Sequence, residues 1–417
     1  LGIELLLLVM LAAGRRDMIA GGLAVAGVML VATTRDAVVL FAALELVSGC
    51  TWLILYSQRA CLADTGVSAA KLATRHVLLS LVGSALLLLG LSIVCGTMGT
   101  TDLETVRYRL DNNQAGLVGA WHIMRLAVAL IFAGLGIRVG VVPFALHLPH
   151  TCRLITNRGA MLLLLLPWFA GTIALIRLLA TILPGLAGTC WPLAGLLAVV
   201  SMGYAGLAAL GEQNIRRLAA YIIIAQSGFM LLGPAAALSQ VGVSESVAVE
   251  PLACRAVDGT LFCLLAMGPS VIGALGVLVY LGREDGQIDV VDELAGLGRT
   301  RPWIAAAMAL FLLSLAGMPP LAGFWARVAV LLPTVTVALT TNSPERWWFA
   351  ALAIAAAASM VLTTVACAGL VVVMYFRLPL ATPKTRGGRA ALVAIVGCVI
   401  LTILIGLGWI AHDIASC

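Results

Sequence analysis

Long apolar stretches alternate with short polar ones along the chain, and this pattern predicts twelve membrane-spanning segments. The expected spans are residues 1–14, 19–33, 36–56, 72–96, 121–156, 161–183, 193–210, 214–236, 251–281, 302–333, 347–376 and 392–411. The first is short for a spanning helix. Residues 97–118 form a long polar loop that we expect to be exposed to water.

The span at residues 302–333 cannot be a regular helix. Unbroken, it would extend for about 48 Å at ~1.5 Å per residue, against a hydrocarbon core of about 30 Å. Pro319 and Pro320 remove two backbone donors, and Gly317 and Gly323 allow an irregular backbone. We therefore predict a broken helix here.

The span at residues 121–156 is also too long for one straight helix, and Pro143 and Pro149 interrupt it. Irregular backbone at membrane depth is tolerated only where protein or a water-filled cavity surrounds it. The sequence thus predicts a second broken helix in protected surroundings.

The order of the spans predicts an internal symmetry. The middle ten form two groups of five, the fourth of each group is broken, and the groups run in opposite directions because five is odd. The predicted fold is an all-α polytopic membrane protein of about 12 helices with two inverted five-helix repeats. The expected parts are residues 1–17 (a short N-terminal helix), 18–183 and 190–376 (the repeats), and 377–417 (a loop and a helix).

Composition supports this fold class and excludes several functions. The 417 residues are 62% hydrophobic and 11% charged, with a mean hydropathy of +1.09. The net charge of +6 lies in short loops between spans, so it does not indicate nucleic-acid binding. The ten cysteines show neither CxxC nor Cys/His ligand spacing, so we expect them in the core and expect no metal site.

Basic residues predict the orientation. Of the 25 Lys and Arg residues, sixteen fall on one side of the threaded chain and five within spans or at their ends. The other side receives four: Arg35, Arg107, Arg109 and Arg346. The basic side is expected to face the cytoplasm or the mitochondrial matrix, with the C-terminus opposite.

Three ionisable residues lie deep within predicted spans. Glu45, in LFAALELVSGCTWLILY, is a lone carboxyl of the kind that a proton relay needs, although a neutral glutamic acid bonded to backbone is the alternative. Arg138 precedes the first break and Arg327 follows the second. Because arginine effectively does not lose its proton, each is a fixed positive charge that tunes its neighbours, or else a packing element between helices.

Other polar residues lie beside a break or in the middle of a predicted span. His147 and His150 flank Pro149 in FALHLPH and could relay protons or bond to freed backbone carbonyls. Gln226 and Ser227, in IIIAQSGFML, could hold water or join helices. The histidines at span ends, including His76, give no indication of a functional role.

At this point several motifs resemble a family. FLLSLAGMPPLAGFWAR, QNIRRLAAYIIIAQSGFMLLG, GTMGTTDLETV, LFAALELVSG and the spacing of GIRVGVVPF resemble subunit N, or subunit 2, of proton-pumping NADH:quinone oxidoreductase (respiratory complex I). The blocks run in the family's order from residue 21 to residue 376. The resemblance implies an antiporter-like, non-redox subunit of that enzyme, which translocates protons while quinone is reduced in neighbouring subunits.

The resemblance also assigns residues. Glu45 matches the family's glutamate, while Arg138 and Arg327 take the places of two lysines. Trp168 stands where a third lysine is expected, and Gln226 where a histidine is expected. In the family's WxPDxYEGAP segment, the aspartate becomes His150.

These departures leave two readings open. Either protons move by Glu45, histidines and water around fixed arginines, or pumping is weakened and the chain is a scaffold between its neighbours. A related sodium/proton antiporter or hydrogenase subunit is a third reading. A metabolite transporter is the least favoured, because no substrate-sized polar cluster is seen.

The resemblance implies no cofactor in this chain, with FMN, iron–sulfur clusters and quinone in other subunits, and structural lipids around it. The implied partners are other membrane-arm subunits and lipids, not nucleic acid. The family usually begins with two more helices than we find. That difference and the divergence suggest the mitochondrial inner membrane of an unusual eukaryote, with a bacterial plasma membrane as the alternative and the C-terminus on the intermembrane-space or periplasmic side.

Overall fold

The structure is a computed structural model. It describes residues 2–4, 7, 15–57, 69–112, 121–181, 187–240, 249–282, 289–340, 345–378, 384–385 and 388–416. The predicted first span, residues 1–14, lies mostly outside the described residues. Gly2, Ile3, Glu4 and Leu7 are the described part of it.

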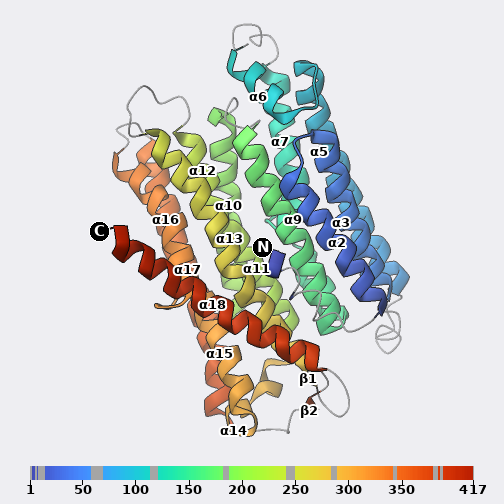
Figure 1. Cartoon of the computed structure of the whole chain (residues 1–417), viewed down its shortest axis with the longest axis vertical. Helices are drawn as coiled ribbons and strands as arrows, with labels where there is room; N and C mark the ends of the chain where they lie inside the picture. The colour runs from blue at the N-terminus through green and yellow to red at the C-terminus, as the bar shows by residue number, and fades with distance from the viewer. Residues whose placement is uncertain are drawn as a thin grey trace.

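Helices dominate the described chain, and most of them run side by side along its long axis (Figure 1). In order they are α2 (Arg15–Thr33), α3 (Ala37–Ser57), α5 (Ala69–Met98), α6 (Leu103–Asn112), α7 (Trp121–Val139), α8 (Leu148–Leu154), α9 (Asn157–Thr181), α10 (Ala187–Leu210), α11 (Ile215–Met230), α12 (Leu232–Ser239), α13 (Val249–Tyr280), α14 (Leu297–Thr300), α15 (Pro302–Ala316), α16 (Ala322–Thr340), α17 (Glu345–Phe376) and α18 (Arg389–Ser416). A 3₁₀ turn (Val291–Leu294) and a two-stranded ribbon of β1 (Leu281–Gly282) and β2 (Lys384–Thr385) complete it.

Ten helices among the described residues are long and apolar enough to cross a membrane, and two shorter apolar helices, Met18–Thr33 and Pro302–Ala316, join them. The predicted all-α, multi-pass architecture is thereby confirmed. Where the sequence predicts one span at residues 214–236, the structure has two helices in line, α11 and α12, which meet at Leu231.

Both predicted breaks are present. Helix α7 ends at Val139 and residues 140–147 are irregular, whereas Pro149 lies in the first turn of α8, where its missing N–H is not needed. Helix α15 ends in Gly317, whose φ of 80° is left-handed. Pro319 and Pro320 follow it in the irregular stretch before α16.

Three expectations about helix limits need correction. The polar loop at residues 97–118 contains α6, because Asp102 caps that helix and Leu103, Val106 and Leu110 bury one face of it. Helix α16 continues past Pro333 to Thr340, since transmembrane helices tolerate an interior proline when neighbours supply the lost bonds. Gly323 lies inside regular helix rather than in the irregular stretch.

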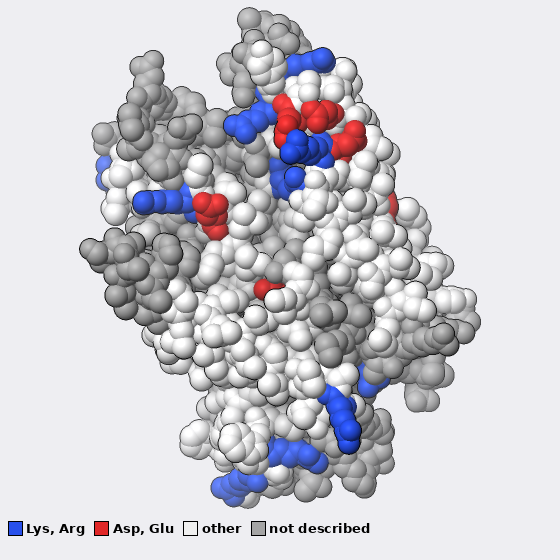
Figure 2. Space-filling model, viewed as in Figure 1, with Lys and Arg blue, Asp and Glu red and all other residues white. Residues whose placement is uncertain are grey.

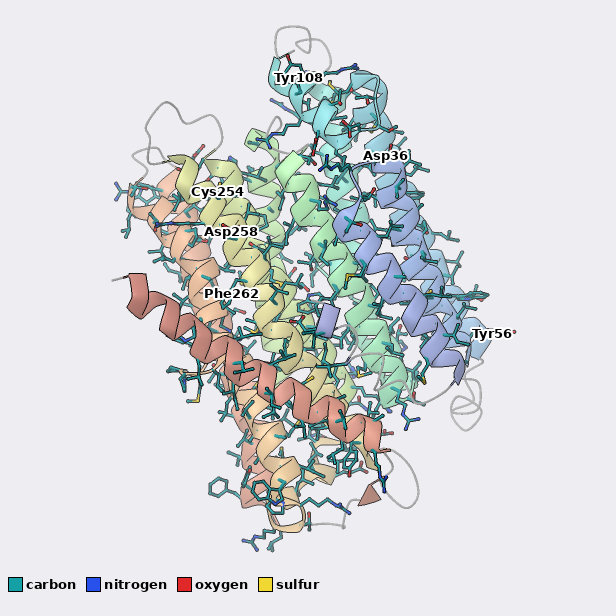
Figure 3. The ribbon with its side chains drawn as sticks, viewed as in Figure 1. Asp36, Tyr56, Tyr108, Cys254, Asp258 and Phe262 are labelled. Carbon is teal, nitrogen blue, oxygen red and sulfur yellow. The ribbon has the colours of Figure 1, made fainter. Side chains whose placement is uncertain are left out.

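A pair of matching backbone joints supports the inverted symmetry. An isolated antiparallel bridge joins Asp36 to Asp102, and another joins Asn214 to Val290. In each, the flanking residues exchange two backbone hydrogen bonds of 2.9–3.0 Å. Asp36 and Asn214 both precede the second helix of their group, and their side chains accept a backbone hydrogen bond from its first turn at 2.7 and 3.2 Å. Figure 3 shows Asp36 where α3 meets α6.

The charged side chains gather at the two ends of the molecule. Figure 2 shows both signs of charge around α6 at one end, mostly basic residues at the other end, and a broad belt between them that is nearly free of charge. The end that carries α14 and the β-ribbon receives the arginines of α8, α14 and the start of α15. Such a belt is typical of a surface that faces lipid.

Helices α9 and α11 form the centre of the bundle. The apolar window of α9 is 94% buried and that of α11–α12 is fully buried, whereas only 33% of the window is buried in α5, α17 and α18. The outer helices therefore present most of their surface to lipid or to other chains. Helix α18 runs obliquely across α13, α15 and α16 rather than parallel to them (Figure 1).

Helices α5 and α7 pack closely because small residues face each other. A Cβ on Gly134 would lie 2.6 Å from the backbone oxygen of Gly83, so neither helix could approach this closely with a larger residue there. This approach places Ser84 beside Arg138, and it carries the start of α5 past the first break.

Candidate functional site

Glu45 and Arg138 form an ion pair in the interior of the bundle. The carboxylate comes from the middle of α3, and the guanidinium comes from the last turn of α7. The Arg138 residue is 6% exposed, while the Glu45 side chain is 33% exposed at the edge of the chain. The acid and the fixed cation are therefore in contact, and no hydrocarbon layer separates them.

Two neighbouring helices, α3 and α5, hold the Arg138 side chain. Its Nη1 donates to the Leu44 carbonyl oxygen at 2.7 Å and to the Ser48 hydroxyl at 2.5 Å, and its Nη2 donates to the Ser84 hydroxyl at 2.8 Å. A positive charge at the C-terminal end of α7 also interacts favourably with the helix dipole. The guanidinium therefore has a fixed position, and its charge determines where the ionised Glu45 carboxylate lies.

His147 and His150 lie at the first break. They are on the side of the Glu45–Arg138 pair that is nearer the basic end, which is the end of the molecule that carries α14 and the β-ribbon. His147 is half-buried, and its Nδ1 lies 3.1 Å from the Phe144 carbonyl oxygen; because that oxygen only accepts, the nitrogen carries the hydrogen. His150 is exposed. His76, on α5, lies near His147, with ring centroids 5.8 Å apart and ring planes tilted by 44°.

Adjacent residues on α11 connect the two breaks. The Ser227 hydroxyl donates to the carbonyl oxygen of Val139, at the end of α7, at 2.7 Å. The Gln226 amide donates to the carbonyl oxygen of Leu315, near the end of α15, at 3.4 Å. Each satisfies a carbonyl that the break leaves without a helical partner. Gln226 thus has a helix-joining role rather than a place beside Glu45.

Arg327 lies in a second cluster, apart from Glu45. It is 1% exposed, and its Nη2 donates to the Leu315 carbonyl oxygen and, at 3.1 Å, to the Thr363 hydroxyl. Its guanidinium carbon lies 5.8 Å from the centre of the Phe229 ring. Among the described residues no carboxylate forms an ion pair with it, so the C-terminal carbonyls of α15 supply its main electrostatic partner.

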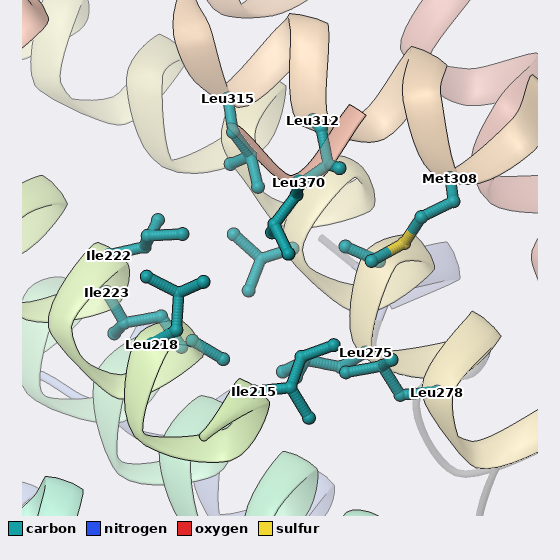
Figure 4. A pocket seen from close by; sticks show the side chains of 13 residues that line it. Ile215, Leu218, Ile222, Ile223, Leu275, Leu278, Met308, Leu312, Leu315 and Leu370 are labelled. Atoms are coloured by element: carbon teal, nitrogen blue, oxygen red, sulfur yellow. The ribbon is translucent and has the colours of Figure 1, made fainter. Parts of the chain in front are cut away.

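The space beside this second cluster is apolar. A cavity of about 30 Å³ here has thirteen apolar residues in its lining, among them Ile222, Met308, Leu312 and Leu315. Figure 4 shows these side chains pointing toward one another from several helices. A cavity with apolar walls stays dry. The second cluster therefore lacks a hydrated approach on this side.

The first cluster is the Glu45–Arg138 pair with its serine partners, and the cavities beside it have polar residues in their lining. A cavity of about 30 Å³ is lined by Ser48, Ser80, Arg138 and Trp168, and a larger one of about 290 Å³ lies toward the basic end. Trp168, which stands at an expected lysine position, is 1% exposed and its Nε1 has no hydrogen-bond partner among the described residues.

Sequence reasoning missed several members of this site. His76 was assigned no role, and Ser48 and Ser84 were not singled out. Ser48 lies one helical turn from Glu45, and a hydroxyl so close to a charge within a span is a usable signal. The sequence around Ser84 gives no such signal. Glu4, a second buried carboxyl, packs against Gly268 of α13. Its position one turn into an apolar run could have identified it.

Two interrupted helices, a buried guanidinium paired with a partly exposed acid, and a second buried guanidinium define a multi-pass membrane protein of the antiporter-like class. The family described as NADH:quinone oxidoreductase/Mrp antiporter, TM, matches residues 34–343. The chain belongs to this family.

Individual relatives agree with the resemblance seen in the motifs. NADH-quinone oxidoreductase subunit N of Nitrosomonas europaea is 30% identical over 305 residues, which cover 73% of this chain and 58% of that protein. The protein of the same name from Geobacillus kaustophilus is 29% identical over 393 residues, 92% of this chain and 72% of its own length. The chain spans about 60% of the length of several curated relatives that it matches.

Solved structures share the fold. A chain of respiratory complex I from Thermus thermophilus with bound NADH aligns with a TM-score of 0.74 at 22% identity, over 97% of this chain and 78% of that one. A chain of the Mrp complex from Dietzia sp. aligns with a TM-score of 0.74 at 18% identity, over 98% and 79%. At these identities the likeness concerns the fold alone.

Proposed function

We propose that this chain is a subunit N-type membrane-arm subunit of an NADH:quinone oxidoreductase and that it translocates protons. The observation that carries the proposal is the Glu45–Arg138 pair, which joins an acid that can take up a proton to a cation that cannot lose one. Relatives that match most of this chain bear the subunit N name, which supports the choice of enzyme.

The pair can work as a simple switch. While Glu45 is ionised, Arg138 holds it; when Glu45 takes up a proton, the attraction is lost and the acid is free to turn. The side chain is 33% exposed at the edge of the chain, so a neighbouring membrane-arm subunit or lipid covers it in the assembled enzyme. No redox cofactor is assigned to this chain; FMN, iron–sulfur clusters and quinone belong to other subunits in this proposal.

The proposed location is a bacterial plasma membrane, because the relatives named here are bacterial. This favours the second of the two locations expected from the sequence over the mitochondrial inner membrane. The basic end would then face the cytoplasm.

The test replaces Glu45 by Gln in the assembled complex and measures protons moved per electron transferred. We expect a lower ratio of protons to electrons with quinone reduction retained. The amide keeps the shape of the side chain but cannot take up and release a proton. Glu104→Gln, at an exposed carboxyl on α6, is the matched control and should leave the ratio unchanged. An unchanged ratio in Glu45→Gln with intact assembly contradicts the proposal.

A second candidate function is a scaffold without pumping. The contacts of Arg327 favour it, since a guanidinium bonded to the Leu315 carbonyl and to Thr363 joins α15, α16 and α17 and carries no exchangeable charge. Unchanged proton stoichiometry in Glu45→Gln, with loss of the complex in Arg327→Gln, would identify this role.

A further inference from the structure

Two cavities follow one another between the basic end and the Glu45–Arg138 pair. The outer cavity, of about 290 Å³, is lined by exposed Arg75 and His150 and by the irregular residues of the first break. The inner cavity, of about 30 Å³, reaches Arg138. His76 and His147 line both cavities, so the two imidazoles form the boundary between them.

The inner cavity has the room and the chemistry for water. Its volume exceeds the roughly 10–15 Å³ that one water needs. Arg138 Nε and Trp168 Nε1 are buried donors without a partner among the described residues, and both side chains line this cavity together with Ser48 and Ser80. A water there would satisfy donors that the protein leaves open.

The two histidines differ in what their nitrogens can do. Nδ1 of His147 donates to the Phe144 carbonyl oxygen, which leaves only Nε2 for exchange. Nδ1 of His76 is buried and has no hydrogen-bond partner among the described residues. A ring with both nitrogens available can accept a proton on one side and release one on the other, and only His76 meets this condition.

We infer that His76 passes protons from the outer cavity to the inner one, next to the Glu45–Arg138 pair, with His147 as the neighbour that holds its ring. This inference rests on the proposed function. A hydronium ion in the outer cavity gives a proton to one ring nitrogen as its O–H bond breaks, and a water molecule remains. The other nitrogen releases its proton to water in the inner cavity, from which it reaches the Glu45 carboxylate, and rotation of the ring restores the starting state.

The charged groups that face His76 are consistent with an imidazole that takes up a proton and releases it again. Arg75 faces it from the same helix, His150 from α8 and Arg138 from α7. Among the described residues no carboxylate lines either cavity. The nearest acid of the site is Glu45, on the far side of Arg138, so a proton on His76 is driven onward rather than trapped by a counter-ion.

The experiment uses the assembled complex in sealed vesicles and measures protons moved per electron in His76→Phe. Phenylalanine keeps a ring against His147 but cannot take up and release a proton. We expect the ratio to fall by the same fraction as in Glu45→Gln, and the double variant to lose no more than either single one, because the two residues act in series. His122→Phe, at an exposed histidine in the first turn of α7, should leave the ratio unchanged.

The outcomes separate this inference from the proposed function. A normal ratio in His76→Phe with a lowered ratio in Glu45→Gln overturns the His76 relay and leaves the proposed function standing. Normal ratios in both variants overturn both. If His76→Phe fails to assemble, His76→Ala is treated with imidazole, which should recover at least half of the lost ratio through the outer cavity; a structural role for His76 predicts no recovery.

Discussion

At the scale of single residues, arginine in place of lysine is the feature that sets the chemistry of this chain. Arg138 makes bonds to α3 and α5 that a lysine ammonium, with three donors on a flexible stem, would not reproduce in the same geometry. In the proposed function, the proton therefore travels on Glu45, histidine and water, and the arginines provide fixed charge.

Removing Arg138 alone should destabilise the protein more than removing the whole pair. Arg138→Gln leaves the Glu45 carboxylate without its partner, at a cost of about 2 kcal/mol, below the roughly 3–5 kcal/mol of a fully buried pair because Glu45 is partly exposed. The double variant Glu45→Gln/Arg138→Gln should regain part of this loss. Thermal unfolding of the purified complex measures both; equal losses in the single and double variants would contradict the ion pair.

At the scale of elements, the broken helices persist because other helices satisfy their free ends. Gly323 allows the start of α16 to lie against α15, since a Cβ there would be 1.8 Å from the Ser314 carbonyl oxygen. Gly406 of α18 lies close to the same break, where a Cβ would be 2.7 Å from the Pro320 carbonyl oxygen.

Gly323→Ala and Gly369→Ala should change stability in opposite directions. The first forces a clash with backbone and should cost about 3 kcal/mol or more. The second, on the exposed face of α17 with no atom near the added methyl, should gain up to about 1 kcal/mol from helix propensity. Thermal denaturation of the two variants tests this; a neutral Gly323→Ala would show that the close contact is absent.

The matching caps of α3 and α11 give a further test at this scale. Asp36→Ala and Asn214→Ala should each cost about 1 kcal/mol. The hydrogen bond from Thr101 lowers the pKa of Asp36, so its contribution is complete above the ordinary aspartate pKa of about 3.9 and is lost as the pH falls below that value.

Asn214 does not titrate, so the Asn214→Ala loss should be the same at pH 7 and in acid, while the Asp36→Ala loss should shrink in acid. Unfolding measured at both pH values decides this. Equal pH dependence of the two variants would argue against the Asp36 cap.

The limits of sequence reasoning also appear among the elements. Prolines within overlong apolar runs predicted both breaks, because a missing N–H is a local property. The pairing of Glu45 with Arg138 and the separation of Arg327 depend on which helix faces come together, and nearly uniform apolar sequence does not encode that locally. His76 was missed for this reason: its significance comes only from its position opposite His147 in the irregular stretch of the first break.

At the scale of the whole molecule, the two predicted repeats differ in polarity. The first half holds an acid, histidines and polar cavities, whereas the second holds a guanidinium among carbonyls and an apolar cavity. We expect proton movement in the first half and a structural role for the second.

The most direct test compares the two halves in one assay, the number of protons moved per electron in sealed vesicles. Glu45→Gln should lower this ratio, while Arg327→Gln should lower the yield and thermal stability of the complex but leave the ratio of the surviving enzyme unchanged. A normal ratio in Glu45→Gln, or a lowered ratio in stably assembled Arg327→Gln, would contradict a proton path confined to the first half.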